Sequence, residues 1–287
     1  MKIENAKKGT AIGKNATQRL LAFGSLILLF LIFSLASPNF AKFDNIVGIL
    51  LATAVTGVLA VGVTFVIITA GIDLSIGTVM TFSSVIAGVF ITFWKLPIFV
   101  GVLAGIAAGA LCGLLNGFAV AKMKIPAFIA TLGMMMITKG LSLVISGTKP
   151  IYFNDTQAFS KISMKTVFGI PNAVLIFFAS AIIADFILSK TILGRYNFAI
   201  GSNEEAARLS GINVDKWKMI IHMLCGIFAG LAGIMMASRL NSAQPALGSG
   251  YELEAIAAAF IGGTSTSGGE GTIMGTVIGA FIMSVLT

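Results

Sequence analysis

Long apolar runs constrain this chain more than any other feature of its sequence. Most are close to the ~20 residues that an α-helix needs to cross the hydrocarbon core of a bilayer. Only 10% of the 287 residues are charged and 57% are hydrophobic, whereas soluble domains carry about 25% charged residues. We predict an all-α fold, a polytopic transmembrane helical bundle of about 8–10 spans with some broken or short helices. The runs cover about 20–36, 46–70, 76–94, 97–121, 126–146, 171–189, 219–237, 253–262 and 273–287.

Residues 1–287 are therefore interpreted as one transmembrane domain, and its charges indicate its orientation. A net charge of +8 would suggest nucleic acid in a soluble protein. Between membrane spans, basic residues instead lie beside anionic lipid, so we expect a lipid bilayer and no nucleic acid. If the spans alternate from a cytoplasmic N-terminus, the inside segments hold twelve Lys and Arg and the outside segments hold six. This bias predicts a cytoplasmic N-terminus and places residues 190–218 in the cytoplasm.

The two ends of the sequence need separate interpretation. A secretory signal peptide is the alternative for the first apolar run, but Ser37-Pro38-Asn39-Phe40 is a poor cleavage site and many spans follow. The last run, 273–287, has fifteen residues and no polar or basic tail. Because a spanning helix needs about 17 to 25 residues, we expect a truncated C-terminus.

The segment 190–218 is a long charged interruption that should face water and a soluble partner, with eight charged residues. Within it, Ser202-Asn203-Glu204-Glu205 is a capping-box pattern. The Ser202 hydroxyl would accept from the backbone N–H of Glu205, whose carboxylate would reach back. Gly211 supplies the left-handed residue that ends such a helix, and Asn213 can cap the next one. We predict a helix of about two turns that continues through Ala206, Ala207, Arg208 and Leu209.

A second feature is the break Gly71-Ile-Asp-Leu-Ser-Ile-Gly77 between two apolar runs. Asp73 is a charge at or near membrane depth, and Ser75 can cap the helix that follows. Broken backbone at that depth lines protein or water, and an ionisable residue there is functional by default. The alternative is an ordinary tight loop with a solvated Asp73.

A further break, 262–271, is rich in glycine and faintly repeats the pattern of the first. A phosphate cradle is disfavoured because the loop has no lysine. We expect a flexible hinge or a cytoplasmic turn near the short capped helix, and we treat an internal repeat as a hypothesis.

The remaining polar residues of the apolar runs divide by chemistry. Lys139 and Asp185 would lower each other's insertion cost by pairing. Cys112, Cys225 and His222 are interpreted as packing residues. Sugar passage generally requires neutral hydrogen-bonding groups, so the candidate path or gate residues are Asp73, Ser75, Asn116, Thr131, Asn241 and Gln244.

The amino-acid sequence around the capped helix resembles that of a known family. Glu205-Ala206-Ala207 followed by Gly211 is similar to the E-A-A-x-x-x-G motif of ATP-binding-cassette (ABC) importer permeases, without the I-x-L-P of its fuller form. The segments 70–77, 199–212, 237–245, 250–258 and 262–265 closely resemble ribose-type monosaccharide permeases, of the branched-chain amino acid/ribose permease superfamily, and the similarity runs from about residue 20 to the last. The resemblance implies a bacterial inner (plasma) membrane protein.

In that family, two permease subunits work with two ATP-binding subunits and an extracytoplasmic sugar-binding protein. The resemblance therefore implies a second permease subunit, taken as a copy of this chain. This chain has no G-x-x-x-x-G-K-S/T phosphate loop, so we expect no cofactor in it, with ATP and Mg bound by the partner ATPase. By the motif match, the ATPase-coupling residues are Ser202, Glu204, Glu205, Ala206, Ala207, Arg208 and Gly211.

Three other classes of protein were weighed against this importer. An ion-coupled secondary sugar transporter, working without an ATPase, would need an ion site, for which Asp73 and Asp185 offer a weak basis. An assembly scaffold leaves the capped helix without a task. A membrane enzyme is disfavoured, because one histidine and no nucleophile constellation give no catalytic or metal-binding residues.

Overall fold

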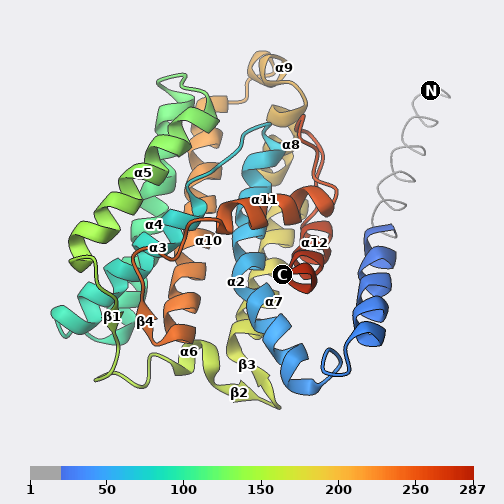
Figure 1. Cartoon of the computed structure of the whole chain (residues 1–287). Helices are drawn as coiled ribbons and strands as arrows, with labels where there is room; N and C mark the ends of the chain where they lie inside the picture. The colour runs from blue at the N-terminus through green and yellow to red at the C-terminus, as the bar shows by residue number, and fades with distance from the viewer. Residues whose placement is uncertain (1–20) are drawn as a thin grey trace.

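The computed structural model describes residues 21–287 and shows a bundle of long helices (Figure 1). The basic residues before position 21, which entered the charge bias, lie outside this range. Within residues 21–287, six helical segments are long and apolar enough to cross a membrane. They are α2 (Phe43–Ile68), α3 with its π-helical continuation η1 (Ile76–Gly88 and Val89–Phe93), α4 (Ile98–Ala121), α5 (Ala127–Ser146), α7 (Asn172–Lys190) and α10 (Val214–Leu240). The predicted polytopic helical fold is confirmed.

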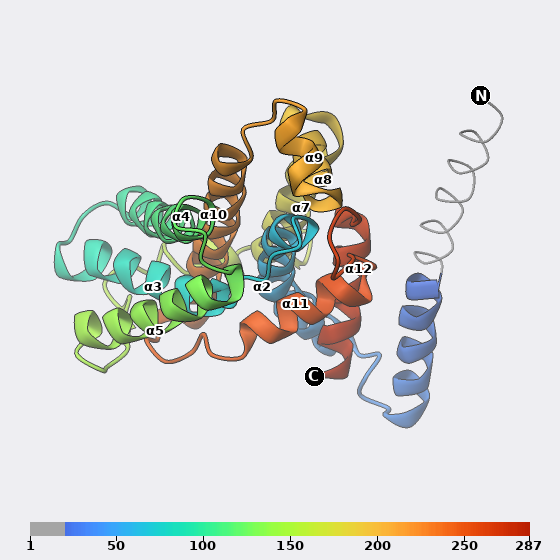
Figure 2. The same cartoon turned by 90° about the horizontal axis from the view of Figure 1, so that it is seen from above.

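Shorter elements complete the described part of the chain. The apolar helix Leu21–Ala36 stands at one side of the bundle (Figures 1 and 2). The remaining helices are α6 (Lys161–Met164), α8 (Ile192–Ser202), α9 (Glu204–Leu209), α11 (Tyr251–Ile261) and α12 (Ile273–Leu286). Four two-residue strands are β1 (Ile151–Tyr152), β2 (Thr166–Val167), β3 (Ile170–Pro171) and β4 (Ser242–Ala243).

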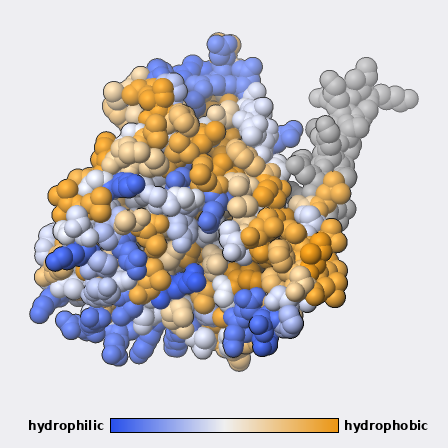
Figure 3. Space-filling model, in the orientation of Figure 1, coloured by the Kyte–Doolittle hydropathy of each residue, from blue (hydrophilic) through white to orange (hydrophobic). Residues whose placement is uncertain are grey.

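The two ends of the bundle differ in structure. Helix α9 stands at one end, which we call the α9 end, and the strands lie toward the other, which we call the strand end (Figure 1). At the strand end, β1 pairs antiparallel with β4, Ile151 opposite Ala243 and Tyr152 opposite Ser242. β2 pairs with β3 in the same way. Hydrophilic atoms gather at both ends and hydrophobic atoms predominate between them (Figure 3), the distribution of a protein that spans a bilayer.

The core is centred on α2 and α10. Helix α2 is buried almost continuously from Leu51 to Ile68, and α10 packs on α2, α3 and α4. Helices α4 and α5 expose many large apolar side chains, which include Leu103, Leu111 and Ile137. Apolar side chains on an outer face are stable in contact with lipid, so these two helices form part of the lipid-facing surface.

Helices α4 and α10 touch along their backbones. A Cβ added to Gly109 would overlap the carbonyl oxygen of Gly226, and one added to Gly113 would overlap that of His222. A Cβ on Gly230 would lie 2.8 Å from the Cα of Ile106. Small residues let membrane helices approach this closely. This α4–α10 seam explains why glycine recurs through the two helices.

Helix α11 does not cross the membrane, so the predicted span at 253–262 is wrong. It has eleven residues, about 16 Å at 1.5 Å per residue, and lies across the other helices midway between the two ends (Figure 1). Its first turn abuts that of α3, because Gly77 packs against the Gly248 carbonyl and the Glu252 carboxylate. Two helices therefore begin inside the bundle.

Candidate coupling and translocation sites

The short helix predicted within 190–218 is α9, but its cap differs from the prediction. Asn203 is the N-cap, and its Oδ1 accepts from the backbone N–H of Ala206 at 2.9 Å. Ser202 is the last residue of α8, and its hydroxyl donates to the Phe198 carbonyl at 2.8 Å. The carboxylate of Glu205 accepts no hydrogen bond within residues 21–287. The predicted Ser202–Glu205 capping box is therefore wrong, and a single Asn203 cap replaces it.

The end of α9 and the start of α10 follow the prediction. Gly211 is left-handed, with φ +86°, a conformation that favours glycine. The backbone N–H of Ile212 donates to the Ala207 carbonyl at 3.1 Å, which turns the chain back. Asn213 Oδ1 then accepts from the backbone N–H of Lys216 at 3.0 Å. Two asparagine caps and one glycine thus define a rigid helix–turn–helix corner.

A small apolar core fixes α9 to its neighbours. Ala207 from α9 is buried with Ile200 of α8 and Val214 of α10, and Trp217 packs against this cluster. The Trp217 ring meets Tyr196 of α8 edge to face at 5.1 Å between centroids. One face of α9 is therefore held by packing.

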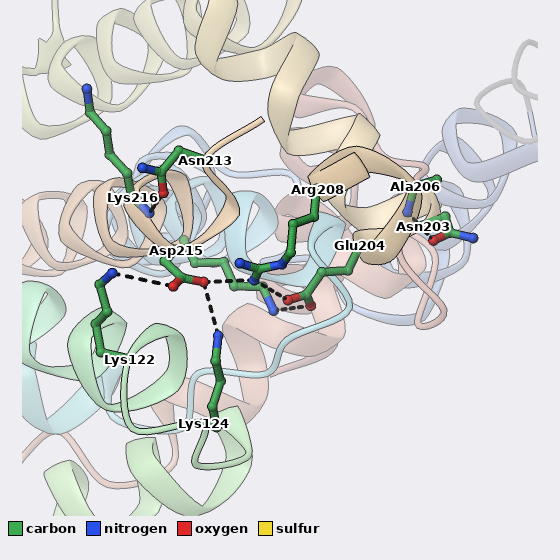
Figure 4. Close-up of polar contacts among 10 residues, drawn as sticks. Lys122, Lys124, Asn203, Glu204, Ala206, Arg208, Asn213, Asp215 and Lys216 are labelled. Atoms are coloured by element: carbon green, nitrogen blue, oxygen red, sulfur yellow. Dashed lines mark hydrogen bonds and ion pairs between the residues drawn. The ribbon is translucent and has the colours of Figure 1, made fainter. Parts of the chain in front are cut away.

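Ion pairs hold the same face. The carboxylate of Asp215, in the first turn of α10, forms ion pairs with Arg208 of α9 at 2.8 Å, with Lys124 at 3.0 Å and with Lys122 at 3.4 Å (Figure 4). Both lysines belong to the turn between α4 and α5. Asp215 therefore links α9, α10 and the α4–α5 turn. We call Asp215, Arg208, Lys122 and Lys124 the Asp215 cluster.

Glu204 extends this network to Lys218, which lies further along α10 than Asp215. Its carboxylate accepts from Lys218 Nζ at 2.5 Å and lies 3.5 Å from Arg208. Partial burial raises the pKa of Glu204, but the hydrogen bonds and charges of Lys218 and Arg208 outweigh it and leave the pKa below its ordinary value. Glu204 is therefore ionised at neutral pH, and its ion pairs are present there.

The joint between α8 and α9 rests on two other segments. A Cβ on Gly201 would overlap the carbonyl oxygen of Ile68, at the end of α2, and would lie 2.6 Å from the backbone nitrogen of Gly269. That nitrogen donates to the same Ile68 carbonyl at 2.9 Å. The glycine-rich break at 262–271 therefore forms a turn beside α8 and α9, as predicted.

The opposite face of α9 is open. Leu209 is 90% exposed, and Glu205 and Ala206 beside it are exposed as well. A large apolar side chain at the water-facing tip of a rigid helix is typical of a contact that a partner covers. The sequence prediction did not single out Leu209 as an exposed apolar residue, and the available signal was a leucine at the end of a helix otherwise made of charged residues and alanine.

The first break places a charge inside the protein. Asp73 is 2% exposed, and its Oδ1 accepts from the backbone N–H of Ser75 at 2.8 Å and from its hydroxyl at 2.6 Å. Asn116 of α4 donates to the same hydroxyl at 2.9 Å. Thr131 of α5 accepts from the backbone N–H of Leu74 at 3.2 Å. The alternative of a solvated Asp73 is wrong, because neighbouring helices enclose it.

The six candidate path residues fall into two groups. Four of them (Asp73, Ser75, Asn116 and Thr131) meet at the first break. The other two follow α10 at the strand end, where Asn241 is left-handed with φ +49° and Gln244 donates to the Ser242 hydroxyl at 3.4 Å. The structure does not bring the two groups into one site.

The predicted Lys139–Asp185 pair is wrong. Lys139 is exposed on α5, which packs on α3 and α4, and Asp185 is exposed on α7, which packs on α2, α6, α8 and α12. Neither forms an ion pair within residues 21–287. Asp73 is buried at a break that contacts α4 and α5, whereas Asp185 is exposed on α7, so the two carboxylates do not share a site and the basis for a two-carboxylate ion site is removed.

The other singled-out residues are packing residues in the structure. Cys112 and Cys225 are buried and unbonded, and His222 is buried with its Nδ1 2.9 Å from the Lys218 carbonyl oxygen. No group of three or more metal-ligating side chains occurs in the part of the chain that the structure describes.

Long apolar helices, a buried polar break and a short helix with one packed and one exposed face define a polytopic α-helical membrane protein. Residues 45–287 match the family described as "Branched-chain amino acid transport system / permease component". The chain belongs to this permease family. Relatives named ribose import permeases confirm its resemblance to ribose-type ABC permeases.

Three relatives illustrate the similarity. The chain is 43% identical over 265 residues to the ribose import permease protein RbsC of Escherichia coli (strain K12), with 91% of this chain and 82% of that one covered. It is 41% identical over 270 residues to RbsC of Bacillus subtilis (strain 168), covering 94% and 84%. It is 40% identical over 267 residues to the L-arabinose transport system permease protein AraH of Escherichia coli (strain K12), covering 92% and 81%.

Proposed function

We propose that this chain is the transmembrane permease subunit of an ATP-driven importer of a ribose-like monosaccharide in a bacterial inner membrane. Two copies form the translocation path, a separate ATPase binds ATP and Mg, and an extracytoplasmic protein delivers the sugar. In this arrangement the α9 end and the N-terminus are cytoplasmic. The names of the relatives support the substrate class, because two are ribose import permeases and one is an L-arabinose transport system permease.

One observation carries the coupling role, namely that α9 is rigid on one face and open on the other. The inner face is fixed by the Asp215 cluster and by the small core around Ala207. The outer face presents Leu209, 90% exposed, with Glu205 beside it. A movement of the ATPase applied to Leu209 would pass directly to α10 and to the α4–α5 turn. That is the property that a coupling helix requires.

The test is a Leu209→Asp variant, co-purified with its ATPase and reconstituted in vesicles. We expect the variant to reach the membrane, to lose ATPase binding and to lose sugar-stimulated ATP hydrolysis, because the charge cannot enter an apolar groove without desolvation. The matched control is Ser210→Asp, which adds the same charge one residue further on.

Glu205→Ala and Gly211→Ala provide further variants of α9. We expect both to reduce uptake and sugar-stimulated ATP hydrolysis while the chain remains in the membrane. Unaltered coupling in Leu209→Asp, Glu205→Ala and Gly211→Ala together would refute the assignment of α9. Sugar uptake by the chain alone, without ATP, would instead show an ion-coupled secondary transporter.

A further inference from the structure

The segment that joins β4 to α11 lies at an unusual depth. It runs along one face of the bundle and leads into α11 midway between the two ends, at the front of Figure 1 and at the lower edge of Figure 2. Residues 245–250 form turns rather than helix, and Ala246, Ser249 and Gly250 are exposed. In Figure 3, hydrophilic atoms interrupt the hydrophobic surface at the same height. Irregular backbone is thus exposed between the two hydrophilic ends of the bundle.

The backbone of this segment is poorly satisfied within the chain. Among residues 21–287, the amides of Ala246, Gly248 and Ser249 have no hydrogen-bond acceptor. The amide of Gly250 is satisfied only by the carboxylate of Glu252, at 3.0 and 3.1 Å. Lipid offers no hydrogen-bonding partner, so exposed irregular backbone occurs at membrane depth only where it lines water or another protein surface. Lipid therefore does not cover this face.

The side chains beside this backbone suit a neutral, hydroxyl-rich ligand. Gln244, Tyr251 and Glu254 are each partly exposed. In the described part of the chain, the carboxylate of Glu254 has one weak partner, the Thr56 hydroxyl at 3.4 Å. An amide, a phenol and a carboxylate together can accept from and donate to sugar hydroxyls, and the tyrosine ring offers an apolar face. An ionisable side chain at this depth is expected to face a cavity and not lipid.

We propose that the segment from Gln244 to Glu254 lines a water-filled sugar path that runs from the strand end to the middle of the membrane, with Tyr251 and Glu254 as sugar contacts. The opposite side of the path is a second copy of this chain, which presents the same segment about a two-fold axis. This inference rests on the proposed function and specifies which face of the chain it uses. Gln244 was a candidate from sequence, whereas Tyr251 and Glu254 were not.

Cysteine labelling of the reconstituted importer tests the path. In a background with Cys112→Ala and Cys225→Ala that retains uptake, single cysteines replace Ser249 and, as a matched control, Ile182. Both positions are exposed, and Ile182 lies near the middle of α7. We expect a charged methanethiosulfonate reagent to modify the cysteine at 249 at least about tenfold faster than the cysteine at 182, because only a hydrated thiolate reacts.

Added D-ribose should slow the modification at 249 and leave the rate at 182 unchanged. Equal rates at the two positions would overturn the path assignment. Labelling is measured without ATP, so equal labelling rates would overturn the path and leave the proposed function untouched. Failure of the proposed function has a different readout, namely sugar uptake by the chain alone without ATP.

A Glu254→Gln variant tests the sugar contact. It keeps the size of the side chain and removes the charged acceptor, so we expect the ribose concentration for half-maximal uptake to rise about tenfold. An unaltered half-maximal concentration would overturn the role of Glu254, and Asp44→Asn, in the first turn of α2, is the control for loss of one charge.

Discussion

Gly201 is the position where one added methyl group should do most damage to α9. The residue lies in the last turn of α8, where the backbones of α2 and of the turn at 262–271 meet it. A Gly201→Ala side chain would overlap the Ile68 carbonyl oxygen and lie 2.6 Å from Gly269 N. Both neighbours are backbone, so no side-chain rotation can relieve the overlap. Either α8 moves away from α2, or the turn moves away from both.

The magnitude follows from two contributions. Forcing extra volume into a packed site costs about 1–3 kcal/mol. The 2.9 Å hydrogen bond from Gly269 to Ile68 lies in the overlapped region, and its loss adds about 1 kcal/mol. We therefore expect Gly201→Ala to lower the free energy of unfolding by about 2–4 kcal/mol. Because α9 follows directly, we also expect reduced sugar-stimulated ATP hydrolysis.

The assay is thermal unfolding of the purified variant in lipid nanodiscs, paired with ATP hydrolysis in the assembled importer. Gly140→Ala is the matched control, since a Cβ at Gly140 on α5 has no atom within 4 Å. That variant should be neutral or slightly stabilising, because alanine favours helix over glycine. A Gly201→Ala protein as stable and as active as Gly140→Ala would refute the backbone contact at this joint.

Three shorter predictions concern the same end of the molecule. Asn203→Ala should destabilise α9 by about 1 kcal/mol, whereas Ser202→Ala should have little effect, as measured by thermal unfolding. Asp215→Asn should weaken sugar-stimulated ATP hydrolysis without loss of ATPase binding, because the docking face is untouched while its link to α10 and the α4–α5 turn is cut. The pKa of Glu204 is lowered from 4.5, so its stabilisation is present above pH 4.5 and is lost as pH falls below it. The difference in melting temperature between wild type and Glu204→Gln should therefore shrink in acid, and a constant difference would contradict the ion pairs.

Features that depend on neighbouring residues were predictable from sequence. Run length located the long helices to within a few residues, because a bilayer fixes how much apolar chain a span needs. Gly211 and Asn213 were placed correctly, since a left-handed residue and a helix cap are chosen by local backbone geometry. The error at Ser202 has a local cause too. Two adjacent side chains could cap the helix, and the extent of α8 decided between them.

Features that depend on distant segments were not predictable. Asp215 gathers Lys122 and Lys124 from far along the chain, and no spacing rule connects them. The predicted ion pair between Lys139 and Asp185 was wrong for the same reason. The position of a residue within its apolar run does not reveal which side of the bundle its helix occupies. Helix α11 was taken for a span since its apolar residues suit a protein interior as well as a bilayer. The short length of α11, its orientation across the other helices and the packing of its first turn against α3 distinguish the two.

The α4–α10 seam limits how this protein can change shape. Where backbone rests on backbone, there are no long side chains that could switch rotamers to let one helix slide along the other. A shift by one residue would drive a neighbouring Cβ into the space that Gly109 or Gly113 leaves open. The two helices must therefore move as one rigid unit, because sliding of one helix along the other is blocked. Any opening and closing of this protein must therefore involve the segments where α3 and α11 begin inside the bundle, and not the contact between α4 and α10.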